Sequence, residues 1–300
     1  MGIIRIEEVC FGVTEIDACR RFCTDIGVEE ASDDAAGAVF RTRTHQIIRL
    51  VPYDDPSLTP GVEAAPSIRE IVWGVESDDD LDRIATELGR DREVKSPRPG
   101  TIRSHDETGF AIAFRHADPA AFPTERRPFN TFGRTERWSA SLAPRGQATP
   151  IRLIHVALDL PKLGREAAID FYIRRLKFKP VEVIVQTGAF LQCEGETDHH
   201  QLFLCHRTDR PGINHIAMEV GDFDEVVEGG NYLIGCGWKE ARRLGRHTVG
   251  SNLFRFFHAP WGGRFEYATD MDKIEKSTPP RTWEVSPPHH LWMMKTSSDA

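Results

Sequence analysis

Two histidines and one carboxylate occupy positions in this sequence that suit a metal site. His155 lies near the middle of an apolar stretch, 151–158, and His215 lies near the middle of another, 212–220. Glu266 lies inside a third strand-like stretch, where an unpaired buried charge would cost several kcal/mol. Two histidines and one carboxylate on three separate strands form the facial ligand set of non-haem Fe(II) enzymes, which leaves one face of the metal open for substrate and dioxygen.

A strand–helix–strands pattern that would position these residues occurs four times along the chain. It occurs twice before residue 117, with helices expected over 15–26 and 79–88, and twice after residue 150, with helices expected over 165–175 and 223–233. Apolar residues recur at helical spacing in these segments, and they alternate or run continuously in the strands between them. This internal repetition predicts an α+β fold of four βαβββ modules, two in each of two domains.

Composition divides the chain into four parts. We expect an N-terminal domain over residues 1–118, a linker over 119–150, a second domain over 151–270 and a C-terminal tail over 271–300. The linker is predicted because the apolar periodicity disappears there and prolines recur. The second domain ends in a hairpin whose turn, 259–263, reads Ala-Pro-Trp-Gly-Gly.

The overall charge and the apolar runs exclude several classes of partner. The net charge of −8 provides no basic surface for nucleic acid and argues against binding to an anionic membrane. No apolar run approaches the roughly 20 residues of a membrane span. The N-terminus is strand-like rather than a signal peptide, and the six cysteines show neither paired CxxC motifs nor a short disulfide framework. We therefore expect a cytoplasmic protein with reduced thiols.

The modules and the three candidate ligands resemble the vicinal oxygen chelate superfamily. More narrowly, they are similar to the type I extradiol ring-cleavage dioxygenases, such as the dihydroxybiphenyl and catechol 2,3-dioxygenases. The resemblance covers roughly residues 1–270 and is strongest over 151–267. It implies two glyoxalase-like domains with cup-shaped sheets and a metal in the second domain only. That metal would be Fe(II), with Mn(II) as an alternative, held by His155, His215 and Glu266.

The resemblance also implies roles for residues around the metal. His200, the second member of a His-His pair, matches the acid–base histidine of the family, and His247, in Gly-Arg-His-Thr, matches its substrate-facing histidine. We expect His247 in a loop before the last hairpin. Candidates for the substrate pocket are Phe190, Phe256 and Trp261. Phe256 stands where the family has a tyrosine, so the hydroxyl that the family places near the substrate is absent.

The first domain provides an internal comparison for the metal site. Aligning its modules with those of the second domain places Glu8 opposite His155, Glu70 opposite His215, and Ala113 or Phe114 opposite Glu266. No His/His/Glu set survives in this alignment. We therefore expect no metal in residues 1–116.

The expected activity is Fe(II)-dependent cleavage of a catechol-type aromatic diol by dioxygen, beside rather than between the two hydroxyls, in the degradation of aromatic compounds. The partners would be a small aromatic diol and dioxygen, and exposed sheet edges predict a homo-oligomer. One alternative is another metal-dependent enzyme of the superfamily, such as an isomerase, an epimerase or a hydroquinone-type ring-cleaving enzyme. Another is a metal-free protein that sequesters a planar ligand, which would predict loss of the ligand residues.

Overall fold

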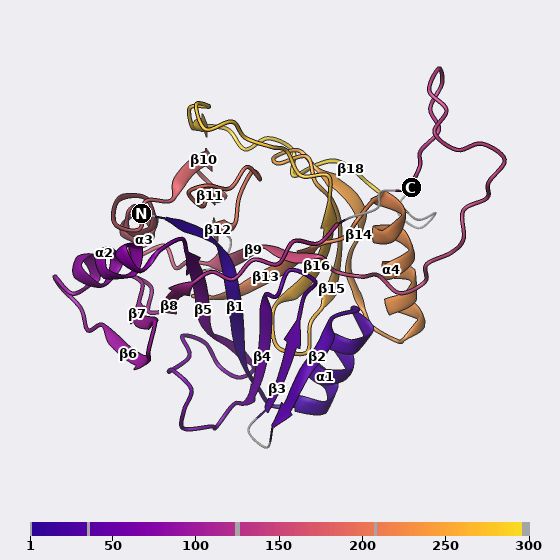
Figure 1. Ribbon diagram of the computed structural model, residues 1–300. Coiled ribbons are helices and arrows are strands. Elements are labelled where there is room, and N and C mark those ends of the chain that lie inside the picture. The colour runs from indigo at the N-terminus through magenta and orange to yellow at the C-terminus, as the bar shows by residue number, and fades with distance from the viewer. Residues whose placement is uncertain (1, 35–36, 124–126, 207–208, 296–300) are drawn as a thin grey trace.

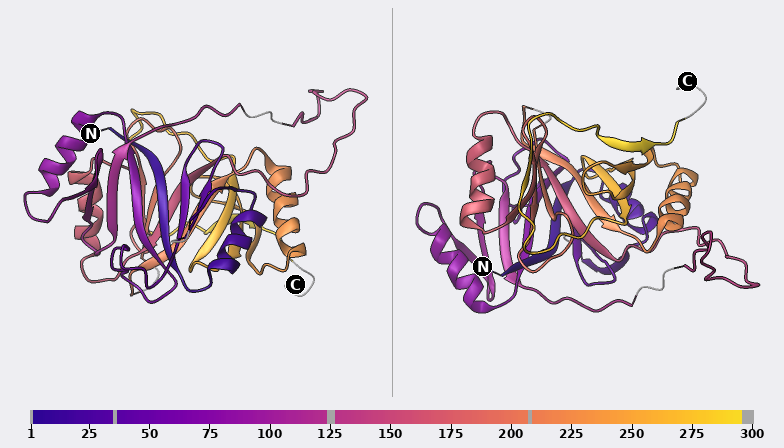
Figure 2. Two further views of the ribbon diagram at one scale, coloured as in Figure 1. Left: turned by 60° about the horizontal axis from the view of Figure 1, so that its bottom comes forward. Right: turned by 90° about the horizontal axis from the view of Figure 1, so that it is seen from above.

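Two large mixed sheets, one from each half of the chain, form the framework of the protein, with helices at the periphery (Figures 1 and 2). The computed structural model describes residues 2–34, 37–123, 127–206 and 209–295. The elements of the first half are β1 (Ile3–Val13), α1 (Ile16–Asp25), β2 (Glu29–Asp34), β3 (Gly37–Arg41), β4 (Ile47–Pro52), β5 (Ser67–Val75), α2 (Asp78–Leu88), β6 (Lys95–Arg98), β7 (Thr101–His105) and β8 (Ala111–His116).

The second half repeats this order and adds two strands from the tail. Its elements are β9 (Arg152–Asp159), α3 (Arg165–Asp170), a π-helical turn (Phe171–Arg175), β10 (Lys179–Ile184), β11 (Gly188–Gln192), β12 (Leu202–Cys205), β13 (Gly212–Glu219), α4 (Phe223–Gly235), β14 (Glu240–His247), β15 (Leu253–His258), β16 (Arg264–Thr269), β17 (Arg281–Trp283) and β18 (His290–Met293).

Each sheet joins two modules through a central antiparallel pair. The first sheet has the order β2-β3-β4-β1-β5-β8-β7-β6, with β1 against β5. The second has the order β17-β10-β11-β12-β9-β13-β16-β15-β14-β18, with β9 against β13. The predicted α+β fold of four repeated modules is therefore confirmed, whereas the domain boundaries stay a prediction.

Strands without a clear apolar pattern were not predicted. Strand β14 carries polar residues on both faces, so we expected a loop at His247; that expectation was wrong, because His247 ends β14 and pairs with the tail. Strands β2 and β6 are also mostly polar and were missed for the same reason. The helix expected over 165–175 ends with a π-helical turn, in which Leu176 N donates to Phe171 O at 3.2 Å.

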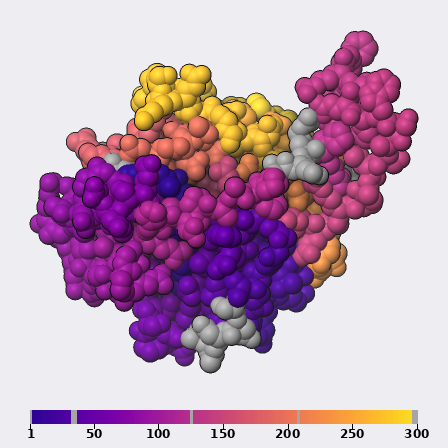
Figure 3. Space-filling model, viewed as in Figure 1, coloured from indigo at the N-terminus to yellow at the C-terminus, as the bar shows by residue number. Residues whose placement is uncertain are grey.

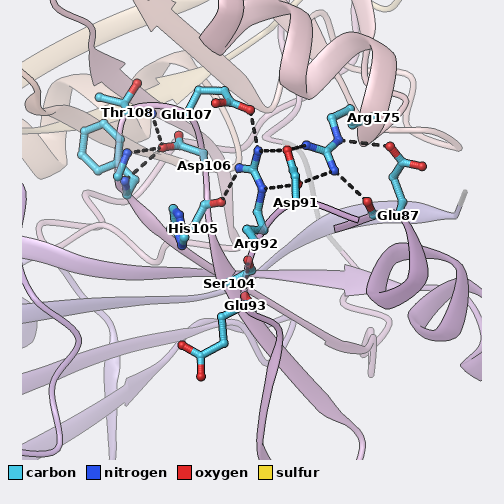
Figure 4. A network of polar contacts seen from close by, with 12 residues as sticks. Glu87, Asp91, Arg92, Glu93, Ser104, His105, Asp106, Glu107, Thr108 and Arg175 are labelled. Atoms are coloured by element: carbon cyan, nitrogen blue, oxygen red, sulfur yellow. Dashed lines mark hydrogen bonds and ion pairs between the residues drawn. The ribbon is translucent and has the colours of Figure 1, made fainter. Parts of the chain in front are cut away.

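Polar contacts tie the two halves together beside α2. Arg175, from the π-helical turn, donates to Glu87 Oε1 at 3.0 Å and to Asp91 Oδ2 at 2.8 Å. Arg92 donates to the other side of Asp91 and to Glu107, so one carboxylate lies between two guanidiniums, as Figure 4 shows. Because these arginines come from different halves of the chain, the network links the end of α2 to the π-helical turn of the second half.

The linker stands clear of the body for much of its length, at the upper right of Figure 1 and of the space-filling view in Figure 3. Its aromatic side chains Phe129, Phe132 and Trp138 are exposed. Within the described residues, no helix is both long enough and apolar enough to cross a membrane.

Candidate metal centre

Strand pairing brings the three predicted ligands together. Strand β13 lies between β9 and β16, and its residue Ala217 pairs with His155 on one side and with Glu266 on the other. His215 lies two residues before Ala217 and so projects from the same face of β13. Three residues that are distant in sequence therefore meet on one face of the second sheet.

The ligand atoms have the spacing of three neighbouring ligands on one ion. His155 Nε2 lies 2.9 Å from His215 Nε2 and 3.2 Å from Glu266 Oε2, and His215 Nε2 lies 3.3 Å from the same oxygen. Divalent ions bind nitrogen and oxygen ligands at about 2.0–2.2 Å, so two ligands at a right angle are about 3 Å apart. All three side chains are buried.

The donor set contains an atom that a cation would satisfy. Glu266 Oε2 is buried and has no hydrogen-bond donor among the described residues, although it faces both histidines. A buried carboxylate oxygen without a donor is costly, and a divalent cation between the three groups would remove that cost. The residues present thus fit a metal with two imidazoles and one carboxylate.

Burial keeps both histidine ligands neutral. It lowers the pKa of His155 to about 3, with a smaller contribution from His199. It also lowers the pKa of His215 to about 3, although Glu266 opposes that shift. Neutral imidazole is the form that binds metals, so both side chains are in that form at neutral pH.

Two asparagines orient the ligands. Asn214 Oδ1 lies 2.8 Å from His215 Nδ1, so the proton of this imidazole faces the asparagine and Nε2 faces the centre. Asn252 donates to Glu266 Oε1 at 3.1 Å and leaves Oε2 for the metal. Partners of this kind fix the tautomer and the direction of a ligand. The sequence analysis missed both asparagines, because their proximity to the ligands depends on side-chain direction and strand register.

His200 lies beside the first ligand in a loop before β12. Its ring centroid is 4.4 Å from that of His155, and its Nδ1 is 3.1 Å from His199 Nδ1. His199 Nε2 in turn lies 3.5 Å from Glu182 Oε1. Burial, together with the neighbouring histidines, lowers the pKa of His200 well below its usual value. His200 is therefore a neutral base held next to the metal position.

His247 approaches the centre from β14. Its Nε2 lies 3.8 Å from Glu266 Oε1, and its ring stacks on Phe254 with centroids 4.1 Å apart. Its Nδ1 faces the tail, 3.4 Å from His289 O. Burial lowers the pKa of His247 well below its usual value, and His289 adds to this shift.

The ligands open onto a cavity of about 190 Å³. Every strand from β9 to β16 contributes at least one lining residue, so the second sheet curves around the cavity. Phe190 and Phe256 both line it: Phe190 stacks on Phe203 at 4.0 Å, and Phe256 meets His215 edge-on at 5.1 Å. Tail residues 286–289 complete the wall, a contribution that the sequence analysis did not assign.

The prediction that Trp261 belongs to this pocket was wrong. Its side chain is fully buried and does not line the cavity. It instead stacks on Phe11 of β1 at 5.2 Å and meets Phe22 of α1 edge-on at 5.0 Å. The turn between β15 and β16 therefore points Trp261 at the first half of the chain, where it packs in the core shared by both halves.

Two arginines that the sequence analysis did not single out also line the cavity. Arg242 comes from β14 and Arg264 from β16, and each guanidinium lies 5.4 Å from the centroid of the Phe256 ring. Glu266 is the carboxylate among the residues that line the cavity. Together with a divalent ion, these arginines would make the cavity favourable for an anionic ligand.

The first sheet repeats the register of the second at the positions that correspond to the ligands. Glu8 pairs with Val72, and Val72 pairs with Ala113. In the second sheet, His155 pairs with Ala217 and Ala217 pairs with Glu266 in the same way. The register thus selects Ala113, not Phe114, as the counterpart of the carboxylate.

Ion pairs occupy these corresponding positions in the first sheet. Arg49 contacts Glu8 at 2.6 Å and Arg115 contacts it at 3.1 Å, while Arg103 pairs with Glu70. In the second sheet, His155 occupies the position that corresponds to Glu8, and His215 the position that corresponds to Glu70. The two sheets therefore share a backbone pattern but differ in their side-chain chemistry.

Known proteins resemble this chain in sequence and in fold. The sequence model of the Glyoxalase/Bleomycin resistance protein/Dioxygenase superfamily matches residues 155–267, the segment from the first candidate ligand to the residue after the last. A curated relative, metapyrocatechase 2 of Cupriavidus necator, is 32% identical over 186 residues, which are 60% of this chain and 57% of the relative. The chain thus matches just over half the length of that relative.

Two solved structures share the fold along nearly the whole chain. A Mn(II)-bound glyoxalase from Novosphingobium aromaticivorans superimposes with a TM-score of 0.76 at 22% identity, covering 96% of this chain and 89% of that one. BphC, a halotolerant catechol dioxygenase, also gives a TM-score of 0.76, at 17% identity, covering 99% and 95% of the two chains. At these identities the likeness establishes the fold.

Proposed function

We propose that this chain, whose residues 155–267 match the sequence model of the Glyoxalase/Bleomycin resistance protein/Dioxygenase superfamily, is a metal-dependent dioxygenase that opens an aromatic diol beside its two hydroxyls. The observation that carries the proposal is the cluster of His155, His215 and Glu266 at the base of a cavity lined by aromatic side chains. The similarity to a metapyrocatechase supports the same reaction class.

Fe(II) is the metal that we propose, with Mn(II) as an alternative, because both ions suit two imidazoles and a carboxylate. When bound, the ion would chelate the two diol oxygens, make them more acidic and provide the place where dioxygen reacts. Asn214 and Asn252 would hold the ligands in position for it.

His200 is the proposed acid–base residue. It is neutral and buried beside His155, so it would accept a proton from a diol hydroxyl as the substrate binds and return it later in the reaction. His247, at the end of β14, would hold the substrate through a hydrogen bond at Nε2, the nitrogen that faces the centre. The two histidines thus divide proton transfer and substrate orientation between them.

The cavity wall fits a small ring that carries negative charge. Phe190, Phe203 and Phe256 offer apolar contact to the ring, while Arg242 and Arg264 would stabilise ionised diol oxygens. A cavity of about 150 Å³ is enough to hold benzene, so about 190 Å³ suits one ring with its two hydroxyls. We therefore propose a single-ring diol as the substrate.

We also propose that the protein is a cytoplasmic homo-oligomer. The exposed aromatic side chains of the linker, Phe129, Phe132 and Trp138, support association with a second copy, because such side chains are rarely left in water. All six cysteines are free thiols, which supports a reducing compartment.

Oxygen uptake after anaerobic loading with Fe(II) tests the proposed reaction. Uptake with a yellow product from a panel of single-ring catechols is expected, and His200→Ala should keep its iron and lose turnover. His258→Ala, at an exposed position at the end of β15, is the matched control and should retain both. Stoichiometric iron without uptake on any diol would discard the reaction but keep the metal site. Metal-free binding of a planar ligand would instead favour sequestration.

A further inference from the structure

The C-terminal tail brings two more histidines to the mouth of the cavity. Strand β17 pairs with β10 and β18 pairs with β14, so the tail borders the second sheet at both edges (yellow in Figure 1). Between these strands, residues 286–289 line the cavity. The pairing of β18 with β14 sets His290 opposite His247, with His289 next to it.

Three imidazoles converge at this place. Nitrogen atoms of His247, His289 and His290 all lie within 4.8 Å of one another, and His289 Nδ1 is 2.7 Å from His290 Nε2. The ring of His247 lies 5.1 Å from that of His289 and 5.6 Å from that of His290. Phe254 is fully buried, and its ring centroid lies 4.1 Å from that of His247 and 5.1 Å from that of His290. Both imidazole rings therefore pack against this apolar side chain.

We propose that His247, His289 and His290 form a second metal site that takes a dication with a preference for imidazole, such as Zn²⁺. Zinc binds imidazole nitrogen at about 2.0–2.1 Å, which places tetrahedral ligands roughly 3.4 Å apart. The 2.7 Å separation between His289 and His290 would therefore widen, and the longer separations, which are within 4.8 Å, would shorten. Because all three ligands are nitrogen atoms, Mg²⁺ and Ca²⁺, which prefer oxygen, are disfavoured.

The surroundings of the three histidines indicate which nitrogen atoms would bind. His289 Nδ1 faces His290 and is the nitrogen that would bind the metal. Arg242 Nη1 lies 3.5 Å from His289 Nε2, so this guanidinium would have to turn away as the proton of the ring moves from Nδ1 to Nε2. His247 Nδ1 faces the tail, whereas its Nε2 faces Glu266. His247 thus lies between the two centres, and its Nδ1 would bind the second metal once its hydrogen bond to His289 O is released.

A metal at this site would hold the tail in place over the cavity. Strand β18 is short and largely exposed, including Leu291 and Trp292, and three residue pairs connect it to β14. A cation shared by His247 and the two tail histidines would add a cross-link between these strands. Residues 286–289 would then stay across the mouth, and access of substrate would depend on the second metal.

Calorimetric titration of the metal-stripped full-length chain with Zn²⁺ tests this inference. The wild type should bind two equivalents, His155→Ala should bind one, and His155→Ala combined with His290→Gln should bind none. The matched control combines His155→Ala with His258→Gln, an exposed histidine on β15, and should keep one equivalent. His290→Gln alone should reduce the wild-type stoichiometry from two to one, which gives a second measurement if His155→Ala does not fold.

The inference is overturned if the wild type binds a single equivalent, or if the second equivalent survives in both His289→Gln and His290→Gln. The titration measures binding without turnover. If the protein cleaves no diol but binds two zinc equivalents, the second site is supported and only the proposed reaction is refuted. If it is an active dioxygenase that binds one zinc equivalent, only the second site is refuted.

Discussion

His155 Nε2 and Glu266 Oε2 lie 3.2 Å apart because their strands flank β13 and pair with the same residue, Ala217. The candidate metal centre is thus a product of sheet register. Ligands that are held by three hydrogen-bonded strands are preorganised, so each substitution at the centre should act on the metal or on the substrate rather than on the fold.

Glu266→Gln should abolish stoichiometric metal binding. The substitution keeps the size of the side chain but removes the negative charge that offsets the cation, so we expect a loss of about 100-fold or more in affinity for Fe(II). Metal content after anaerobic loading measures it, with the exposed Glu284→Gln as the control. A Glu266→Gln protein with one iron per chain would refute the assignment of this ligand.

Asn252→Ala should weaken metal binding without removing a ligand. The asparagine donates to Glu266 Oε1, and loss of such an orienting partner typically costs about 10–100-fold in metal affinity. Competition with a chelator measures the change. Asn130→Ala in the exposed linker should leave the affinity as in the wild type. Equal affinities for the two variants would show that Asn252 does not orient the carboxylate.

Phe256→Tyr should alter turnover and leave the metal in place. The ring of Phe256 lies 5.1 Å from that of His215 and 6.2 Å from that of His247, so a hydroxyl there would reach the substrate position. One additional hydrogen bond in the transition state is worth about 0.5–1.5 kcal/mol, which predicts a change in kcat of roughly 2–10-fold. Steady-state oxygen uptake at constant iron content tests this. Loss of iron, or an unchanged kcat, would contradict it.

Tyr172→Phe should destabilise the protein more at pH 8 than at pH 5. The hydroxyl of Tyr172 donates to Asp106 Oδ2 at 2.9 Å, and burial raises the pKa of Asp106 from 3.8 to about 6. With its pKa raised in the folded state, Asp106 stabilises the fold most below about pH 4, and this contribution is lost as pH rises through about 6.

The Tyr172 hydroxyl favours the ionised carboxylate, so its removal costs most where Asp106 is ionised, about 1–3 kcal/mol at pH 8 and less at pH 5. Urea unfolding at the two pH values measures the difference, and Tyr232→Phe on the outer face of α4 is the control. An equal cost at both pH values would show that Asp106 does not titrate in this range.

Trp261→Ala should affect stability and leave substrate affinity unchanged. Trp261 packs between Phe11 and Phe22 in the shared core, away from the cavity, and loss of a buried tryptophan costs about 3–5 kcal/mol. Denaturant unfolding measures the loss, and the exposed Trp138→Ala should stay within about 0.5 kcal/mol of the wild type. A raised KM, measured below the unfolding transition of the variant, would show that Trp261 contributes to the substrate pocket.

The elements with strong periodicity could be predicted from the sequence. The helix expected over 79–88 is α2, Asp78–Leu88, and the helix expected over 223–233 is the start of α4, Phe223–Gly235. Strand β14 could not be predicted, because its sequence, Glu-Ala-Arg-Arg-Leu-Gly-Arg-His, has no alternation and its place depends on pairing with β15 and β18. Periodicity reports which face is buried, and a strand with two polar faces has no such signal.

The candidate ligands were visible in the sequence because each is a polar residue in the middle of an apolar strand. Their supporting residues were not. Asn252 reaches Glu266 only through the β15–β16 pairing, and His289 reaches the cavity only because β18 joins the far edge of the sheet. Trp261 was wrongly assigned to the pocket because a turn residue can point to either side of its hairpin. Its direction depends on packing against Phe11 in the first half of the chain, which the sequence pattern does not show.

The central claim is ring opening by dioxygen, and product analysis after reaction under isotopically heavy dioxygen tests it most directly. Enzyme loaded with Fe(II) should convert a single-ring catechol into a ring-opened semialdehyde that carries both heavy oxygen atoms, and His200→Ala should yield none. A product that is still cyclic, or one that carries no heavy oxygen while iron is bound at one per chain, would contradict the account.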